Sequence, residues 1–141
     1  MCIRDRLDVF GTATVASTPY DTWGNGSFAH SFTDKDPTHD PDGDGMTNFQ
    51  EFAFGLDPTS GAALNPITQP LDKSTGTFQY TRRVGTGLTY QILSSPDLGT
   101  WVPDTGATEV AVTTHGDIQT VTVHVSTQPL NGKLFVRVQA Q

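Results

Sequence analysis

The acidic residues of this 141-residue chain gather in one short stretch, and this clustering limits how the stretch can fold. Between residues 34 and 57, seven Asp and Glu side chains accompany one base, Lys35, whereas the rest of the chain carries eight acids and seven bases. Carboxylates held close together repel one another unless a cation neutralises them. The sequence therefore predicts a cation site here, with a merely polar turn as the alternative.

The centre of this stretch, residues 40–51, fits the twelve-position calcium-loop pattern D-x-[DN]-x-[DN]-G-x5-E without a mismatch. Calcium binds hard oxygen atoms at about 2.3–2.6 Å, and carboxylates at alternate positions of a tight turn converge on one ion. Gly45 permits the necessary bend. The predicted ligands are Asp40, Asp42, Asp44, the main-chain carbonyl of Met46, Asn48 through a water molecule, and Glu51 with both carboxylate oxygens.

Other ions suit these residues less well. Magnesium prefers octahedral sites at about 2.1 Å with several waters. Zinc favours His or Cys ligands, and His39 alone does not make such a site. Asp34, Asp36 and Asp57 either extend the site or form a second one, or they are solubilising loop residues and caps.

Two short helices are expected around the loop. Ser17-Thr18-Pro19 is typical of a helix start, with an N-cap hydroxyl and Pro at the first helical position. Tyr20 and Trp23 would share one face of that helix, and Phe28 and Phe32 would continue the apolar surface. The spacing of apolar residues predicts a second helix over Met46–Phe54, which Gly55 would cap.

The second half of the chain has the alternation of half-buried strands, with apolar residues separated by Thr, Gln, Arg or His. The turns between them include Asn131-Gly132, a strong hairpin signal. The expected fold is mainly β with a small α segment, in which an EF-hand-like calcium loop and helix are packed on or linked to an antiparallel β-sandwich of about six strands. The predicted strands are Thr77–Val84, Leu88–Ser95, Leu98–Val102, Thr108–Thr113, Ile118–Val125 and Lys133–Gln139.

These patterns divide the chain into four parts. Residues 1–16 combine an adaptor-like start with a weakly strand-like tail of a lost upstream region, so we expect the chain to be the end of a longer protein. Residues 17–58 form the helical calcium-loop segment, residues 59–75 a linker and residues 76–141 the β-sandwich domain. The single cysteine, Cys2, excludes an internal disulfide.

Charge and composition exclude several functions. A net charge of -7 and an isoelectric point near 4.7 argue against nucleic acid and anionic lipid as partners. No apolar run reaches the ~20 residues that span a bilayer, which argues against membrane insertion. No catalytic motif is present, since no Gly-x-Ser-x-Gly turn surrounds any serine that could pair with His115 or His124. We therefore expect no enzymatic activity.

The run from Asp40 to Pro58 resembles the DPDGDGxxNxxEFAxGxDP segment of large secreted bacterial proteins, and it is similar to thrombospondin type 3 loops and to half of a dockerin. The strands that follow look like the β module found after that segment. The resemblance implies a secreted or cell-surface, non-catalytic C-terminal module that binds calcium and joins upstream domains of its parent chain. It departs from dockerins in having one loop, and Thr47 replaces the aliphatic residue of paired EF-hands.

The expected function is therefore calcium-stabilised structural support within a larger exported protein. One alternative is a module that binds carbohydrate or another cell-surface component, for which Tyr80, Tyr90 and Trp101 would form an exposed aromatic platform. Another is protein docking through the helix over Met46–Phe54, which would require Phe49 and Phe52 to be exposed.

Overall fold

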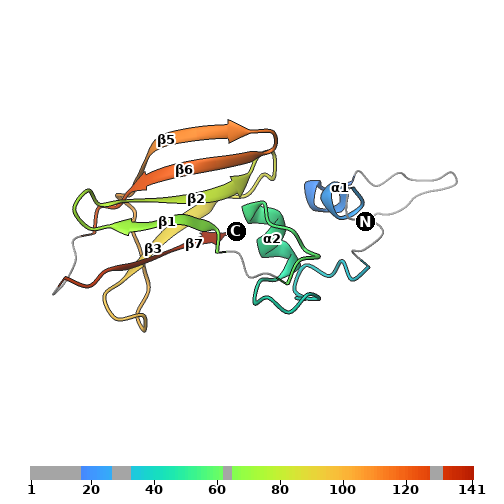
Figure 1. Cartoon of the computed structure of the whole chain (residues 1–141), viewed down its shortest axis with the longest axis horizontal. Helices are drawn as coiled ribbons and strands as arrows, with labels where there is room; N and C mark the ends of the chain where they lie inside the picture. Colours follow the sequence, from blue (N-terminus) through green and yellow to red (C-terminus); the bar gives the residue numbers. More distant parts are fainter. Residues whose placement is uncertain (1–16, 27–32, 62–64, 128–131) are drawn as a thin grey trace, which may run out of the picture.

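The computed structural model describes residues 17–26, 33–61, 65–127 and 132–141. They form two antiparallel sheets with two short helices at one end (Figure 1). The expected fold class, mainly β with a small α segment, is confirmed. Within the described residues, neither helix is long and apolar enough to cross a membrane. The predictions made for residues 1–16 and for Phe28 and Phe32 lie outside the described residues.

The larger sheet has four strands in the order β1-β2-β6-β5, and the smaller has three in the order β4-β3-β7. All pairings are antiparallel, and the central ones join distant parts of the chain: Phe78 lies opposite Val123, and Ile92 opposite Val138. The strands are β1 Ile67–Asp72, β2 Thr77–Arg83, β3 Tyr90–Ser95, β4 Val102–Pro103, β5 Thr108–His115, β6 Ile118–His124 and β7 Phe135–Ala140.

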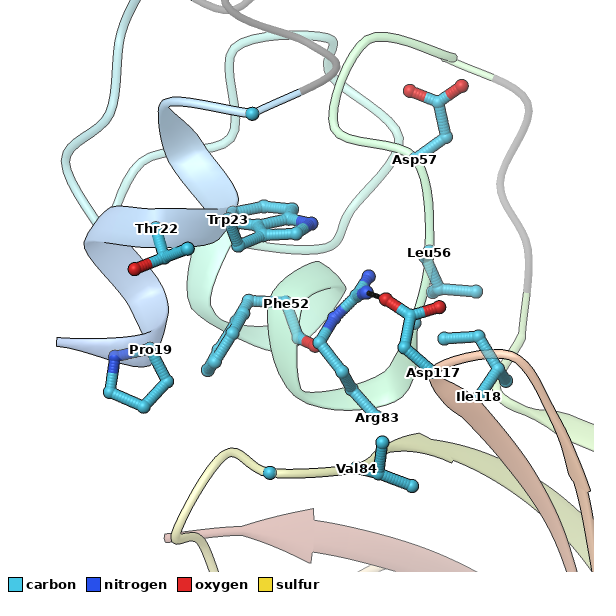
Figure 2. A pocket seen from close by; sticks show the side chains of 13 residues that line it. Pro19, Thr22, Trp23, Phe52, Leu56, Asp57, Arg83, Val84, Asp117 and Ile118 are labelled. Atoms are coloured by element: carbon cyan, nitrogen blue, oxygen red, sulfur yellow. Dashed lines mark hydrogen bonds and ion pairs between the residues drawn. The ribbon is translucent and has the colours of Figure 1, made fainter.

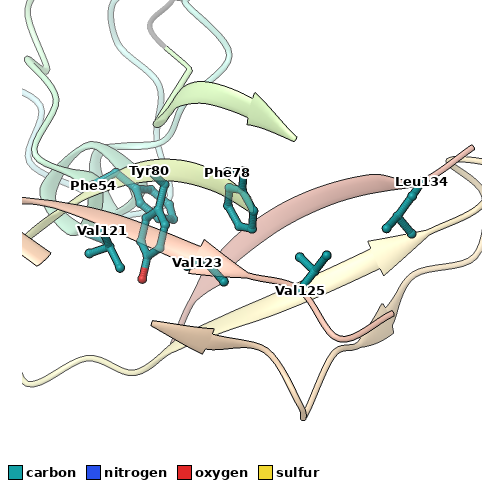
Figure 3. Packing of buried hydrophobic residues seen from close by; sticks show 8 residues of the cluster. Phe54, Phe78, Tyr80, Val121, Val123, Val125 and Leu134 are labelled. Carbon is teal, nitrogen blue, oxygen red and sulfur yellow. The ribbon is translucent and has the colours of Figure 1, made fainter. Parts of the chain in front are cut away.

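The core lies between the two sheets (Figure 3). Phe78 and Tyr80 of β2 alternate with polar neighbours, as do Val121 and Val123 of β6, so each strand turns one row of apolar side chains inward. The smaller sheet packs partly buried apolar residues against this cluster, and helix α2 adds Phe54. Burial of such side chains is worth roughly 1.5–3 kcal/mol each, and it is the main force that holds the sandwich together.

One strand prediction and the linker prediction are wrong in part. Only Val102 of the predicted strand Leu98–Val102 lies in a strand, the two-residue β4, because Asp97 accepts hydrogen bonds from the N–H groups of Gly99 and Thr100 and closes a turn. Leu98 in that turn has a φ of +66°, which no strand allows. Conversely, part of the predicted linker 59–75 is ordered as the strand β1, whose pairing with β2 contains two register shifts.

The prediction of one buried and one exposed face is also wrong for β5, all eight residues of which are exposed. This strand extends beyond the three-stranded sheet, so neither of its faces is covered. The turn predicted at Asn131-Gly132 lies partly outside the described residues, and the strands on either side of it, β6 and β7, belong to different sheets.

Both predicted helices are present and both begin with a capping box. Helix α1, Pro19–Gly24, starts after the N-cap Thr18, and helix α2, Asn48–Phe54, starts after the N-cap Thr47. Each cap side chain accepts a hydrogen bond from the third helical N–H. Gly55 ends α2 with a φ of +77°, as its position after the apolar stripe predicts.

The end of α2 is fastened to the sandwich by side chains of β2 and β3. The last carbonyls of a helix have no partner within it. Here the Arg83 Nε donates to the Phe52 carbonyl at 2.9 Å, the Tyr90 hydroxyl to Ala53 at 2.7 Å and the Thr81 hydroxyl to Phe54 at 3.0 Å. Helix α2 is therefore packed on the sandwich, with the acidic loop at its other end.

Candidate metal centre

The acidic loop is organised around Asp40. Its carboxylate accepts hydrogen bonds from the backbone N–H groups of Gly43 at 2.8 Å, Asp44 at 3.2 Å and Gly45 at 2.9 Å. These bonds, led by that of Gly45, hold the pKa of Asp40 below its ordinary value. Gly43 and Gly45 adopt positive φ angles of +76° and +96°, which let the chain wrap around this side chain.

The loop brings three carboxylates together. One oxygen from each of Asp40, Asp42 and Asp44 lies within 4.8 Å of the other two. Asp44 is fixed by the N–H of Met46 at 2.8 Å. Burial and the neighbouring carboxylates raise the pKa of Asp42, one oxygen of which is buried without a hydrogen-bond partner in the described part of the chain. Three of the predicted ligands therefore do converge.

Glu51 lies beside this cluster, although its oxygens fall outside the 4.8 Å group. Its side chain is 0 % exposed, and neither carboxylate oxygen has a hydrogen-bond partner among the described residues. Burial and then the charges of Asp42, Asp44 and Asp40 raise its pKa to about 8. An ionised carboxylate that is buried without a donor is costly, which is the physical reason for the raised pKa.

The other two predicted ligands, Met46 and Asn48, also make contacts within the fold. Met46 packs its side chain against the core, as expected for a residue whose carbonyl alone would bind metal. The buried Asn48 side chain donates to the carbonyls of Asp34 and Asp36, both at 2.9 Å, and so ties the incoming chain to the start of α2. Its Oδ1 has no partner in the described part of the chain.

Asp34, Asp36 and Asp57 do not join the carboxylate cluster. Asp34 bonds to the His39 ring at 2.9 Å. Asp36 and Asp57 each accept from the backbone and hydroxyl of a threonine two residues later. These local bonds are those of capped turns, so nothing in their geometry singles out a second ion site.

A separate pocket of about 620 Å³ lies between α1, the end of α2 and the β5–β6 turn (Figure 2). Arg83 crosses it, paired with Asp117, with its guanidinium 5.8 Å from the Trp23 ring centre and 5.9 Å from that of Phe52. Arg83 thus joins three elements, a role that no sequence pattern indicates. The pocket contains none of the six predicted calcium ligands, although Asp57, a candidate for an extended or second site, lies on its wall.

Most of the residues that the two alternative functions require are buried or contact other residues within the fold. Tyr80 is buried, and the Tyr90 hydroxyl is bonded to the helix. Trp101 is half-buried, with the Arg137 guanidinium 4.5 Å from its ring centre. Phe52 is buried against Tyr20 and Trp23. Phe49, the other residue of the docking alternative, is half-buried and lines a surface pocket with Arg137. Tyr80, Tyr90 and Trp101 form no exposed aromatic row.

Comparisons of the chain with protein-family models, with curated proteins and with solved structures found no match.

Proposed function

We propose that this chain is a non-catalytic module whose fold is stabilised by a bound calcium ion. The observation that carries the proposal is Glu51, a fully buried carboxylate with no hydrogen-bond partner among the described residues, next to three aspartates that share one loop. The cluster has acidic oxygens and no base among its members, which suits a hard divalent cation.

The residues that would hold the ion are those of the loop and the first turns of α2. Asp40, Asp42 and Asp44 would contribute carboxylate oxygens, Met46 its carbonyl, and Glu51 both oxygens after a small adjustment toward the cluster. Asn48 would act through a water molecule. The ion would supply the positive charge that lets these carboxylates stay ionised side by side.

Binding at the loop would stabilise the whole module through α2. The ion would hold the start of the helix, while Arg83, Tyr90 and Thr81 hold its end on the sandwich. Ligand linkage gives about 2.7 kcal/mol when free calcium exceeds the dissociation constant about 100-fold. Extracellular modules bind calcium with dissociation constants of about 10⁻⁴–10⁻³ M, so millimolar calcium would give part of that stabilisation.

The resemblance of residues 40–58 to a segment of secreted bacterial proteins extends the proposal to location. On this resemblance, the proposed location is the cell surface or the medium, and the module would be part of a larger exported protein. Carbohydrate binding and helix docking remain weaker proposals, because the aromatic residues they require are largely engaged within the fold.

The test is thermal unfolding of the chain in calcium and in EDTA, with calorimetric titration of calcium. We expect calcium to raise the melting temperature by several degrees, since about 1 kcal/mol moves a domain of this size by ~2–8 °C. Glu51→Gln should abolish most of this response, because it removes the charge while keeping the side-chain volume.

Glu109→Gln is a matched control, because it makes the same chemical change outside the loop and should keep the full response to calcium. Equal melting temperatures in calcium and EDTA would contradict the proposal. So would a Glu51→Gln variant that binds calcium as tightly as the wild type.

A further inference from the structure

Helix α1 packs on α2 at the residue next to a proposed calcium ligand. The ring centres of Tyr20 and Trp23 each lie 5.4 Å from that of Phe52, which follows Glu51 directly in α2. Phe52 and Glu51 are both buried. A displacement of this turn of α2 would therefore move the aromatic contact with α1 and the Glu51 carboxylate together.

A second connection runs from α1 to residues 33–39, the segment that leads into the acidic loop. The Tyr20 hydroxyl donates to the Lys35 carbonyl at 3.0 Å. The Lys35 Nζ in turn donates at 2.7 Å to the side chain of Asn25, the C-cap of α1. Both ends of the helix are thus bonded to the same residue of this segment.

Residues 33–39 are held by the first turn of α2. The N–H of Asn48 donates to the His39 carbonyl at 2.8 Å and that of Phe49 to the Pro37 carbonyl at 3.0 Å. The Asn48 side chain bonds to two further carbonyls of the segment. Asn48 is also a proposed ligand through water, so the start of α2 contacts both the ion site and the segment that carries α1.

Helix α1 depends on these contacts for its folded state. It has six residues, of which Gly24 alone is buried, and so short a helix is not stable in water by itself. Besides Phe52 and Lys35, it contacts Arg83, whose guanidinium lies 5.8 Å from the Trp23 ring centre (Figure 2). Loss of order at the start of α2 would remove most of what holds α1.

We propose that docking of α1 on α2 is coupled to calcium binding in the loop, and that α1 is mostly undocked without calcium. Tyr20 and Trp23 are then positioning residues for the calcium site, although neither is a proposed ligand. Without a cation, repulsion among Asp40, Asp42, Asp44 and Glu51 would disturb the first turns of α2. Because this coupling needs a calcium ion in the loop, it rests on the proposed function.

Coupling between two sites is reciprocal, so a change that weakens docking of α1 must weaken calcium binding by the same factor. Calorimetric titration of calcium into the full chain tests this with Tyr20→Phe, which removes the bond to Lys35 and keeps the ring. We expect the calcium dissociation constant to rise about two- to tenfold, the loss that corresponds to one hydrogen bond.

Tyr80→Phe is the matched control, because it makes the same change in the core of the sandwich, where the hydroxyl accepts from Arg82 at 3.4 Å. It should leave the calcium dissociation constant unchanged.

Hydrogen exchange of the wild type gives a second measurement that needs no substitution. The amides of Thr22 and Asn25 are bonded within α1. They should exchange at least about tenfold faster in EDTA than in calcium, while the amides of β6 stay protected in both.

The outcomes separate this coupling from the proposed function. If the wild type binds calcium but α1 exchanges equally fast in calcium and EDTA, the coupling is overturned and the proposed function stands. The same holds if Tyr20→Phe binds calcium as tightly as the wild type. A wild type that binds no calcium overturns both.

Discussion

Asp104 illustrates how one carboxylate can link parts of the fold that are distant in sequence. It follows β4 in the smaller sheet, yet its side chain accepts the N–H groups of Ser126 at 2.8 Å and Thr127 at 3.1 Å, just after β6 of the larger sheet. It also accepts the Ser126 hydroxyl. Burial alone would raise the pKa of Asp104, but these hydrogen bonds outweigh it and the pKa lies below its ordinary value.

Replacing Asp104 by Asn should destabilise the sandwich by about 2 kcal/mol at neutral pH, since hydrogen bonds to a charged group are worth about 1.5–3 kcal/mol. A lowered folded pKa stabilises the protein above the unfolded pKa of about 3.9, and this stabilisation is lost as the pH falls through the folded value. Urea unfolding of both proteins at several pH values measures the difference. We expect it to shrink below about pH 4, and a gap that is constant down to pH 2 would argue against this role.

The spacing of residues along the sequence predicts contacts between residues that are close in sequence. The convergence of Asp40, Asp42 and Asp44 follows from their alternate positions in a glycine-rich turn, and the structure brings them together. The bonds of Asn48 to Asp34 and Asp36 span 14 and 12 residues, and those of Asp104 to Ser126 and Thr127 span 22 and 23. No short pattern encodes such partners, because the tertiary fold chooses them.

Helix α2 depends on its surroundings more than on its own sequence. A helix of seven residues is far below the length that is stable in water. It is held by the N-cap Thr47, by burial of Phe52 and Phe54, and by the three side chains that bond its last carbonyls. The apolar stripe predicts that the helix exists, but the donors from β2 and β3 could not be predicted from it.

Tyr90→Phe and Thr81→Val should each destabilise the module by about 1 kcal/mol, because each leaves a helix carbonyl without its donor. Chemical denaturation of the calcium-loaded protein measures this cost. Thr113→Val provides the control, since it makes the same exchange of hydroxyl for methyl on the exposed strand β5 and should cost less than about 0.5 kcal/mol. Equal effects at positions 81 and 113 would mean that the Thr81 bond contributes nothing.

The strands were predictable where alternation was regular and missed where it was not. β2 and β6 alternate cleanly, and their predicted bounds differ from the observed ones by one residue. β1 pairs irregularly around Pro70, which conceals a strand within a stretch that reads as linker. The exposure of β5 depends on the unequal width of the two sheets, a property of the assembled sandwich and not of the strand.

Helix α2 connects two parts of the molecule, the sandwich and the segment that carries the acidic loop, and these parts have different sources of stability. The sandwich is held by a core between two sheets, with pairings such as Phe78 to Val123 that close long loops. The segment over residues 33–61 has fewer buried apolar residues, and it depends on its acidic loop and on the bonds at the end of α2. We therefore expect the two parts to open at different free energies.

This difference should be visible when calcium is removed by chelation. The proposal predicts that chymotrypsin then cuts at Phe49 or Phe52 while the amide hydrogens of β2 and β6 remain protected from exchange. Calcium should suppress the cut, and mass spectrometry of the fragments reports both states. Cleavage at the same rate with and without calcium would contradict the coupling.

The seven-residue length of α2 thus has a consequence beyond folding. We expect so short a helix, which connects the acidic loop to the sheets, to unfold when either of its ends is released. Where ambient calcium falls, the region near the helix would loosen first and present a cleavage point to proteases, while the sandwich stays whole. A fall in calcium concentration would then lead to a local, irreversible break in the polypeptide.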